Sequence, residues 1–304
     1  MGAGLDLIRV GPAGWSYPDW EGRVYPRHKP PGFHPLRHLA AFVDVIEVNS
    51  TFYGVPRAEH AARWTELVAD RGSFRFVAKL HQDFTHAPVP EDPAEWERRA
   101  SAWRAGLEPL LRRKLLAAVL VQFPTSFQQG PSAVQRLGRL RHLLEGLPLV
   151  LEVRHTSWFE PPARDEVAGL GYSLAHVDLP PAWNHPPERH PPTGPVGYLR
   201  LHGRNAASWF RRDAGRDQRY DYLYGPPEVG ELARKARSIA AETDETYVVT
   251  NNHFEGQAVA NAVELRWLLN DRRPVPAPAE LVAAFPHLES LVEARPTGSR
   301  GLFD

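Results

Sequence analysis

Short apolar runs alternate with longer amphipathic segments along most of the chain. The short runs are rich in valine, isoleucine, leucine and phenylalanine and are bounded by polar or turn-forming residues, which predicts buried β-strands. Eight strands are expected, over Leu7–Gly11, Val45–Asn49, Phe74–Leu80, Ala117–Phe123, Leu149–Arg154, Tyr172–Asp178, Gly197–His202 and Thr246–Asn251.

The longer segments carry apolar residues three and four positions apart, the period of an amphipathic helix. Such stripes include Trp64, Trp96, Val134, Val229 and Ala258. Nearly continuous apolar strands separated by helices are typical of a parallel sheet covered on both faces. We therefore predict an α/β protein with a closed (β/α)8 TIM barrel in a single domain. A doubly wound open sheet is the alternative, although no G-x-G-x-x-G motif follows the first strand.

Proline-rich segments mark the connections between these elements. The chain has 30 prolines, and they gather in loops because proline lacks the N–H that a strand or helix interior requires. The longest such loop, Leu179 to Pro195, is expected to be mobile or to act as a lid. The barrel domain is predicted over residues 1–272, followed by a Pro-rich connection and C-terminal extension over residues 273–304.

Composition and charge narrow the function classes. Hydrophobic residues make up 42% and charged residues 24%, as in a folded globular protein. Lys plus Arg and Asp plus Glu are both 36, so no net charge draws the chain to nucleic acid or to an anionic membrane. The absence of cysteine excludes disulfides and thiolate metal ligands. No signal-peptide pattern and no membrane-spanning apolar run is found, so we expect a cytoplasmic protein without a membrane partner.

Polar and charged residues lie at the C-terminal ends of the predicted strands. In a barrel of this kind these ends and the following loops form the active site. We therefore expect a shared polar pocket, which would also give the amide of Gln122 its hydrogen-bond partners. The candidate catalytic residues are Glu47, Lys79, Glu152, Arg154, Asp178 and His202. The candidate ligand-binding residues are Trp15, Tyr17, Asn49, Gln122, Arg200, Arg204, Asn251 and Asn252.

Each of these residues also has a structural interpretation. Glu47 and Lys79 could form an ion pair inside the barrel. Arg154 and Arg200 could bind carboxylates or helix carbonyls, and aromatic residues such as Trp15 are often packing residues. A common pocket explains the whole set better, because filling a core does not require a hydrogen-bonding residue at every strand end.

The segment NNHFEGQAVANA predicts a strand end, a turn and a helix whose free N–H groups could hold an anion beside Arg204. Phosphate sites of barrels often form in the loops after strands seven and eight. We therefore expect a phosphorylated or otherwise anionic ligand near Arg204 and Asn252. The same helix start could instead be an ordinary Asn cap.

Seven motifs occur in order between about Leu7 and Leu269: GPAGWSYPDWEGRVYP, IEVNSTFYGVP, FRFVAKLHQDFTH, LVQFPTSF, LEVRHTSW, YLRLHGR and VVTNNHFEGQAVANA. Together they resemble the family catalogued as domain of unknown function 72, also called YecE-like. The resemblance implies a TIM-barrel fold and no established activity. Ala13 stands where serine is commoner in this family, so this turn offers no hydroxyl there. The segment after Asp271 lies outside the resemblance.

The first functional hypothesis is an enzyme of hydrolase or lyase type that acts on a phosphate-bearing or other small anionic substrate. Glu152 or Glu47 would act as general base. Lys79 and Arg154 would stabilise developing negative charge, and Arg204 would hold phosphate.

Two alternatives remain open. In the first, a divalent metal binds Glu152, Asp178 and His202, as in a metal-dependent phosphodiesterase or nuclease-like enzyme. No other cofactor is expected. In the second, the protein binds single-stranded nucleic acid without catalysis. Aromatic and arginine residues around the pocket mouth would make that surface, among them Trp15, Trp158, Trp209, Arg211 and Arg212. The oligomeric state is not indicated.

Overall fold

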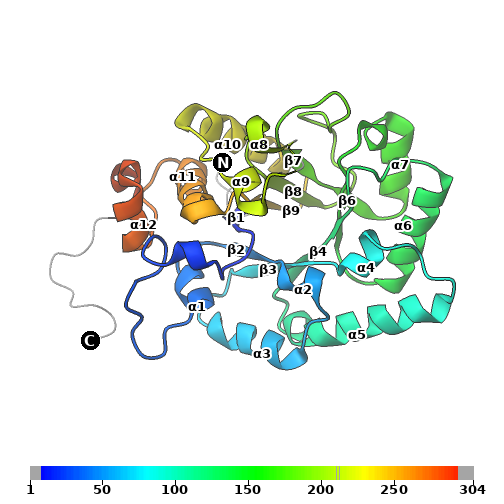
Figure 1. The fold of residues 1–304 in the computed structure, drawn as a ribbon, viewed down its shortest axis with the longest axis horizontal. Coiled ribbons are helices and arrows are strands. Elements are labelled where there is room, and N and C mark those ends of the chain that lie inside the picture. Colours follow the sequence, from blue (N-terminus) through cyan, green and yellow to red (C-terminus); the bar gives the residue numbers. More distant parts are fainter. Residues whose placement is uncertain (1–7, 210, 212, 294–304) are drawn as a thin grey trace.

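Parallel β-strands alternate with helices along the chain (Figure 1). The structure is a computed structural model and describes residues 8–209, 211 and 213–293 of the 304. Leu7 of the first expected strand, Arg212 of the expected nucleic-acid surface and residues 294–304 of the expected extension lie outside these ranges.

The described strands form two parallel sheets, with orders β1-β9-β8-β7 and β2-β3-β4-β5-β6. The strands are β1 (Ile8–Pro12), β2 (Val45–Val48), β3 (Arg75–Lys79), β4 (Leu116–Gln122), β5 (Leu149–Glu152), β6 (Tyr172–Leu174), β7 (His176–Asp178), β8 (Val196–Leu201) and β9 (Glu245–Thr250).

Helices follow most strands and surround the sheets (Figure 1). Proline begins α1, α5, α6, α7 and α10, where its missing N–H would have had no helical partner. None of the helices in the described ranges combines the length and the apolar character needed to cross a membrane. The α-helices are α1 (Pro35–Leu39), α2 (Ser50–Tyr53), α3 (Ala58–Leu67), α4 (Gln82–Thr85), α5 (Pro93–Arg112), α6 (Pro131–Leu143), α7 (Pro161–Gly169), α8 (Ala206–Trp209), α9 (Arg216–Tyr220), α10 (Pro226–Ala240), α11 (Gln257–Leu269) and α12 (Ala279–Ala284). The 3-10 helices are η1 (Pro18–Trp20), η2 (Thr156–Trp158), η3 (Phe254–Gly256) and η4 (Pro286–Leu291).

The α/β class and the parallel strands are confirmed, but the strands do not form the single closed sheet that was expected. The sixth expected strand, Tyr172–Asp178, is interrupted at Ala175. Its first half, β6, pairs with β5, and its second half, β7, pairs with β8 in the other sheet. Backbone pairing therefore divides the strands into two sheets at this point.

The two sheets approach each other again where β1 meets β2. One parallel bridge joins Ala13 to Glu47, and the N–H of Gly14 donates to the Glu47 carbonyl at 2.8 Å. Gly11 allows this approach, since a Cβ at that position would lie 1.8 Å from the carbonyl oxygen of Val45. Only glycine lets the two backbones come this close.

The hydrophobic core has an inner cluster and two outer ones. The outer clusters lie between the sheets and the helices. The inner cluster combines residues from both sheets, including Val77 and Leu120 from one and Tyr198 and Val249 from the other. Both sheets therefore enclose a common interior.

Residues 273–293 pack against the rest of the described structure, with α12 beside α11 (Figure 1). Leu281 of α12 and Leu288 of η4 are fully buried in the same cluster as Trp20 and Val24. The domain boundary between residues 272 and 273 stays a prediction.

Candidate functional site

The C-terminal ends of the strands open into a cavity of about 350 Å³. Residues from the ends of β3, β4 and β8 and from the loops after β1, β2 and β9 form its walls. Seven of the residues expected to belong to the site line it: Trp15, Tyr17, Asn49, Lys79, Gln122, Arg200 and Asn251. Side chains from strand ends far apart in the sequence thus share one space.

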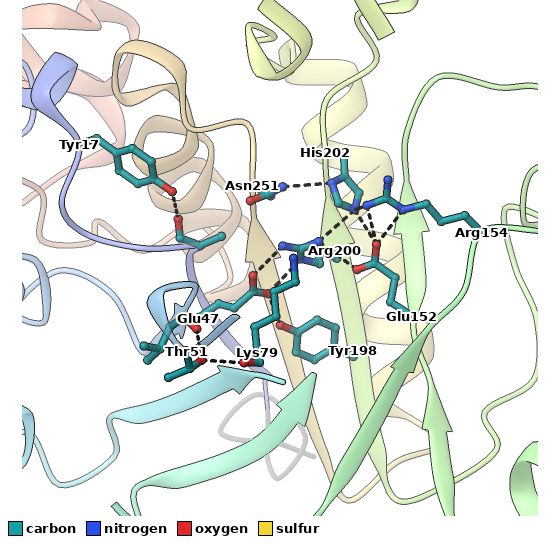
Figure 2. Close-up of polar contacts among 12 residues, drawn as sticks. Tyr17, Glu47, Thr51, Lys79, Glu152, Arg154, Tyr198, Arg200, His202 and Asn251 are labelled. Atoms are coloured by element: carbon teal, nitrogen blue, oxygen red, sulfur yellow. Dashed lines mark hydrogen bonds and ion pairs between the residues drawn. The ribbon is translucent and has the colours of Figure 1, made fainter. Parts of the chain in front are cut away.

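Arg200 of β8, which lines this cavity, joins carboxylates from two strands of the other sheet (Figure 2). Its Nε and Nη2 donate to Oε2 and Oε1 of Glu47 at 2.9 and 2.6 Å. Its Nη1 donates to Oε2 of Glu152 at 3.0 Å. The hydroxyl of Tyr198 donates to Oε2 of Glu47 at 2.7 Å. All four residues are buried, so these ions are held away from water.

Arg154, His202 and Asn251 extend this network (Figure 2). The Nε and Nη2 atoms of Arg154 donate to Oε1 of Glu152 at 3.0 and 2.8 Å. The Nε2 atom of His202 lies 3.3 Å from the same oxygen, and its Nδ1 lies 3.1 Å from Nδ2 of Asn251. An amide nitrogen can only donate, so Nδ1 of His202 accepts and Nε2 carries the proton that faces Glu152.

The arginines and burial determine which residues of this network are charged. Burial would raise the pKa of Glu152, but Arg200 and Arg154 hold it well below its usual range. Burial lowers the pKa of His202 to about 3, although Glu152 acts in the opposite direction. Near pH 7, Glu152 is therefore an anion and His202 is neutral.

The expectation that Glu152 or Glu47 acts as general base does not fit this geometry. Both side chains are fully buried, and both oxygens of each carboxylate accept hydrogen bonds from arginine. Charge-assisted hydrogen bonds stabilise a carboxylate and make it a weak base. The ion pair considered between Glu47 and Lys79 also does not form, because the cation that binds Glu47 is Arg200.

Lys79, the last residue of β3, extends into the cavity instead. Its Nζ lies 3.9 Å from the centre of the Phe52 ring, and within the described residues it makes no ion pair with a carboxylate. Burial and then the positive charge of Arg200 lower the pKa of Lys79 to about 7, while Glu47 and Glu152 oppose part of the shift. A large share of the amine is therefore neutral near pH 7 and can accept a proton.

Aromatic rings and amides form the remaining walls. The Tyr17 ring stacks on His253 with 4.6 Å between the ring centres, and Trp15 packs edge-on against Trp64. The side-chain amide of Gln122 donates to the carbonyl of Phe123 at 2.9 Å. The amide that ends the apolar strand β4 is thus paired locally and still borders the cavity.

Asp178 and Arg204 lie in a different cavity, of about 480 Å³, beside α10. The Nε and Nη2 atoms of Arg204 donate to Asp178 at 2.9 and 2.6 Å. Tyr224 also donates to Asp178, and Glu228 lies 3.4 Å from Nη1 of Arg204. Carboxylates of the chain itself therefore neutralise Arg204, which was expected to hold phosphate.

The expected anion site at Asn252 does not form either. The Asn252 side chain is fully buried and donates to the Tyr222 carbonyl and to Asn261, each at 2.8 Å. The backbone N–H of Glu255 in η3 donates to the carboxylate of Asp19 at 2.6 Å. A carboxylate of the chain therefore takes the place where a ligand anion was expected.

The three residues considered as metal ligands do not converge. Glu152 and His202 are in contact, but Asp178 points into the other cavity. Throughout the described ranges, no group of three histidine, aspartate or glutamate side chains is arranged to hold a metal ion. The metal hypothesis therefore has no ligand set in this structure.

The residues considered for nucleic-acid binding are also divided. Trp158 is fully buried and stacks on Phe127, so it cannot stack on a base in this structure. Trp209 packs edge-on against His202, and Arg211 pairs with Asp213 on the surface. These residues do not present one common stacking surface.

Tyr198, Tyr220 and Phe52 are site residues that sequence reasoning did not select. Tyr198, Arg200 and His202 alternate along one strand, so the period of two would have placed Tyr198 in the interior. Phe52 follows β2 in the segment STFY, and its ring contacts Lys79. Tyr220 reaches the cavity from α9, far along the connection after β8, and no sequence signal marks it.

Comparison with known proteins finds one matching family model and several related proteins. The family model for proteins of unknown function DUF72 matches residues 9–282, which extends past Leu269, where the motifs end. UPF0759 protein YunF of Bacillus subtilis (strain 168) is 26% identical over 292 residues, covering 90% of this chain and 99% of that protein. UPF0759 protein YecE of Escherichia coli (strain K12) is 27% identical over 169 residues, covering 54% of this chain and 55% of that protein.

Two crystal structures are similar to this chain. A DUF72 family protein from Enterococcus faecalis V583 (EF0366) has 28% identity and a TM-score of 0.74, covering 86% of this chain and 95% of that one. A DUF72 family protein from Thermotoga maritima MSB8 (TM1631) has 28% identity and a TM-score of 0.73, covering 87% of this chain and 99% of that one. The chain therefore belongs to the DUF72 family of proteins of unknown function.

Proposed function

We propose that this protein is an enzyme of lyase or hydrolase type that binds a small anionic substrate in the cavity at the C-terminal strand ends. Lys79 is the residue that acts on the substrate. The substrate carries a phosphate or a carboxylate group. The two sheets are proposed to work as one (β/α)8 barrel, which is supported by the shared interior and by the Ala13–Glu47 bridge.

One observation carries this proposal: a buried lysine amine faces an open cavity without a carboxylate partner among the described residues. Burying a cation without a partner is unfavourable, so such a lysine needs a reason to be retained. A lysine that served only solubility would lie on the surface, not at the end of an interior strand. Buried lysines with a pKa near 7 are frequent at catalytic sites.

The charge balance favours an anionic ligand. Glu47 and Glu152 are matched by Arg200 and Arg154 in the network described above. A proton bound by Lys79 therefore adds a positive charge that no carboxylate within the described residues compensates. A bound anion should raise the pKa of Lys79, and protonation of Lys79 should strengthen anion binding by the same free energy.

The walls of the cavity suit oxygen-rich groups. Asn49, Gln122 and Asn251 offer amides, and Ser16 and Ser50 offer hydroxyls. Amides and hydroxyls can donate hydrogen bonds to phosphate or carboxylate oxygens. The neutral amine of Lys79 can then take a proton from the bound substrate, which is the role first considered for Glu152.

Anion-dependent thermal stability tests this proposal. We expect inorganic phosphate or phosphoglycolate to raise the melting temperature of the wild-type protein, since a ligand at about 100 times its dissociation constant adds about 2.7 kcal/mol to the free energy of unfolding. The increase should be larger at pH 6 than at pH 8, because Lys79, whose pKa is about 7, is mainly protonated at the lower pH.

Matched variants make the test specific. Lys79→Met should lose the anion-dependent increase, whereas Lys114→Met, at an exposed position, should keep it. An equal increase in Lys79→Met, or no increase in the wild type with either anion at any pH, would contradict the proposal.

A further inference from the structure

We propose that Lys79 is a nucleophile that forms a Schiff base with a small carbonyl compound bearing a carboxylate or phosphate group. This inference rests on the proposed function and specifies it: the substrate is an aldehyde, a ketone or a 2-oxo acid, and the chemistry is of lyase type.

The position of Lys79 suits attack on a carbonyl carbon. Its side chain rises from the end of β3 near Glu47 and Arg200 (Figure 2), and it is one of the residues that line the cavity of about 350 Å³. The Phe52 ring covers one side of the amine, with 3.9 Å between Nζ and the ring centre. Lys79 also lines the cavity, so a substrate bound there can approach the amine.

The electrostatic environment keeps the amine reactive. Nucleophilic attack requires the neutral form, because a protonated amine has no free electron pair. Burial and the neighbouring Arg200 lower the pKa of Lys79 to about 7, and no carboxylate forms an ion pair with Nζ in the part of the chain that the structure describes. Desolvation next to a second cation is a known way to activate a lysine.

The other three lysines of the chain lack this combination. Lys29 forms an ion pair with Glu21, and Lys114 is exposed. Lys235 borders the second cavity, where burial lowers its pKa, but Asp178 and two glutamates there favour its charged form. Lys235 is therefore the matched control: it is a partly buried lysine beside a cavity, with carboxylates near it.

The covalent step is balanced without a further reactant. The neutral amine of Lys79 attacks the carbonyl carbon, a C–N bond forms as the C–O double bond becomes single, and a proton passes from the amine nitrogen to the carbonyl oxygen to give a carbinolamine. Loss of this oxygen as water, with one further proton, leaves a protonated imine. Overall, amine, carbonyl compound and one proton give the iminium ion and one water.

The iminium ion defines the reaction class. It withdraws the electron pair of a neighbouring C–H or C–C bond and an enamine remains, so that either a proton leaves or the carbon chain is cleaved and the other fragment leaves as a carbonyl compound or carbon dioxide. Protonation of the enamine and addition of water then release the product and restore the amine. A hydrolase acting by general-base catalysis alone would form no covalent bond to Lys79, which provides the distinction to be tested.

Reductive trapping is the direct test. The full-length protein is incubated near pH 7 with glyoxylate or with dihydroxyacetone phosphate and sodium cyanoborohydride, which reduces the iminium ion to a stable secondary amine. Peptide mass spectrometry then measures the modified fraction at each of the four lysines. We expect modification at Lys79 to exceed that at Lys29, Lys114 and Lys235 at least tenfold, and to be reduced by added phosphate.

Two variants separate this inference from the proposed function. Lys79→Arg keeps the positive charge but cannot form an imine, so it should bind phosphate and show no trapped product at this position. If wild-type Lys79 is not modified preferentially by either compound while phosphate still stabilises the wild type and not Lys79→Met, the Schiff base is refuted and the anion-binding proposal stands. If phosphate also has no effect, both are refuted.

Discussion

His202 shows how the environment of a single residue decides its chemical role. The histidine follows β8 directly and was considered both a catalytic residue and a metal ligand. In the structure it is fully buried, and its two nitrogens face Asn251 and Glu152. With a pKa of about 3, it is a neutral hydrogen-bonding residue that orients the carboxylate beside it.

The protonation of His202 predicts a pH dependence of stability. The unfolded histidine, with a pKa of about 6.5, binds a proton that the folded protein accepts only near pH 3. The unfolded state is therefore favoured as the pH falls from 6.5 towards 3, by about 1.4 kcal/mol per pH unit from this residue. Urea unfolding between pH 7 and 4 should show a shallower decrease for His202→Asn than for the wild type. Equal slopes would mean that His202 is charged in the folded protein.

Lys79 and Glu152 exchange the roles that residue type alone suggested. A glutamate was the natural candidate for a base and a lysine for a cation. Two arginines keep Glu152 ionised, whereas burial leaves much of the Lys79 amine neutral near pH 7. Neighbouring charges and burial therefore decide which of the two residues can accept a proton.

At the scale of elements, the Arg200 network connects the two sheets. Strand β8 belongs to one sheet, while β2 and β5, which carry Glu47 and Glu152, belong to the other. Arg200 also lines the cavity. The network therefore both fixes the relative position of the sheets and shapes the site.

Removal of Arg200 should destabilise the protein strongly. Arg200→Met leaves Glu47 buried without its guanidinium partner. Removing one partner of a buried ion pair lowers the free energy of unfolding by about 3–5 kcal/mol. The double variant Glu47→Gln/Arg200→Met should recover part of this loss, because the unpaired charge is gone. Arg112→Met, which removes an exposed ion pair with Glu108, should change the free energy of unfolding by about 0–1 kcal/mol. Denaturant unfolding measures all three, and a similar small effect of Arg200→Met and Arg112→Met would disprove the connecting role.

At the scale of the whole molecule, residues 273–293 contribute side chains to the hydrophobic core. Leu281 and Leu288 are each fully buried against residues of the N-terminal third of the chain, such as Trp20 and Val24. The described part of this segment therefore contributes to the stability of the protein that contains the site.

A core substitution in this segment tests that contribution. Leu281→Ala should lower the free energy of unfolding by about 2–5 kcal/mol, the usual cost of leaving a cavity in a packed core. Leu223→Ala provides the control, since Leu223 is 39% exposed. Thermal or denaturant unfolding measures both. A loss for Leu281→Ala no larger than for Leu223→Ala would show that residues 273–293 are dispensable for folding.

Sequence reasoning placed seven of the expected residues around the candidate cavity because strand ends are visible in the hydrophobic pattern. Residues such as Lys79, Gln122 and Arg200 could be placed at the C-terminal ends of parallel strands, and these ends meet on one side of a sheet. The same reasoning failed for Asp178, which ends β7, and Arg204, which follows β8, because they pair with each other in the second cavity. Side-chain direction and partners there depend on Tyr224 and α10, elements far along the chain.

The sequence alone determined the alternation of parallel strands and helices, the membership in the DUF72 family and the strand ends at which polar side chains gather. Periodicity and motifs are local properties, so they can be read without coordinates. Only the tertiary structure decided that β6 and β7 belong to different sheets, that Arg200 binds both Glu47 and Glu152, and that Lys79 remains unpaired among the described residues. Pairing, burial and pKa arise from contacts between distant segments, and the physical reason is that electrostatic free energy depends on distance in space and on exclusion of water.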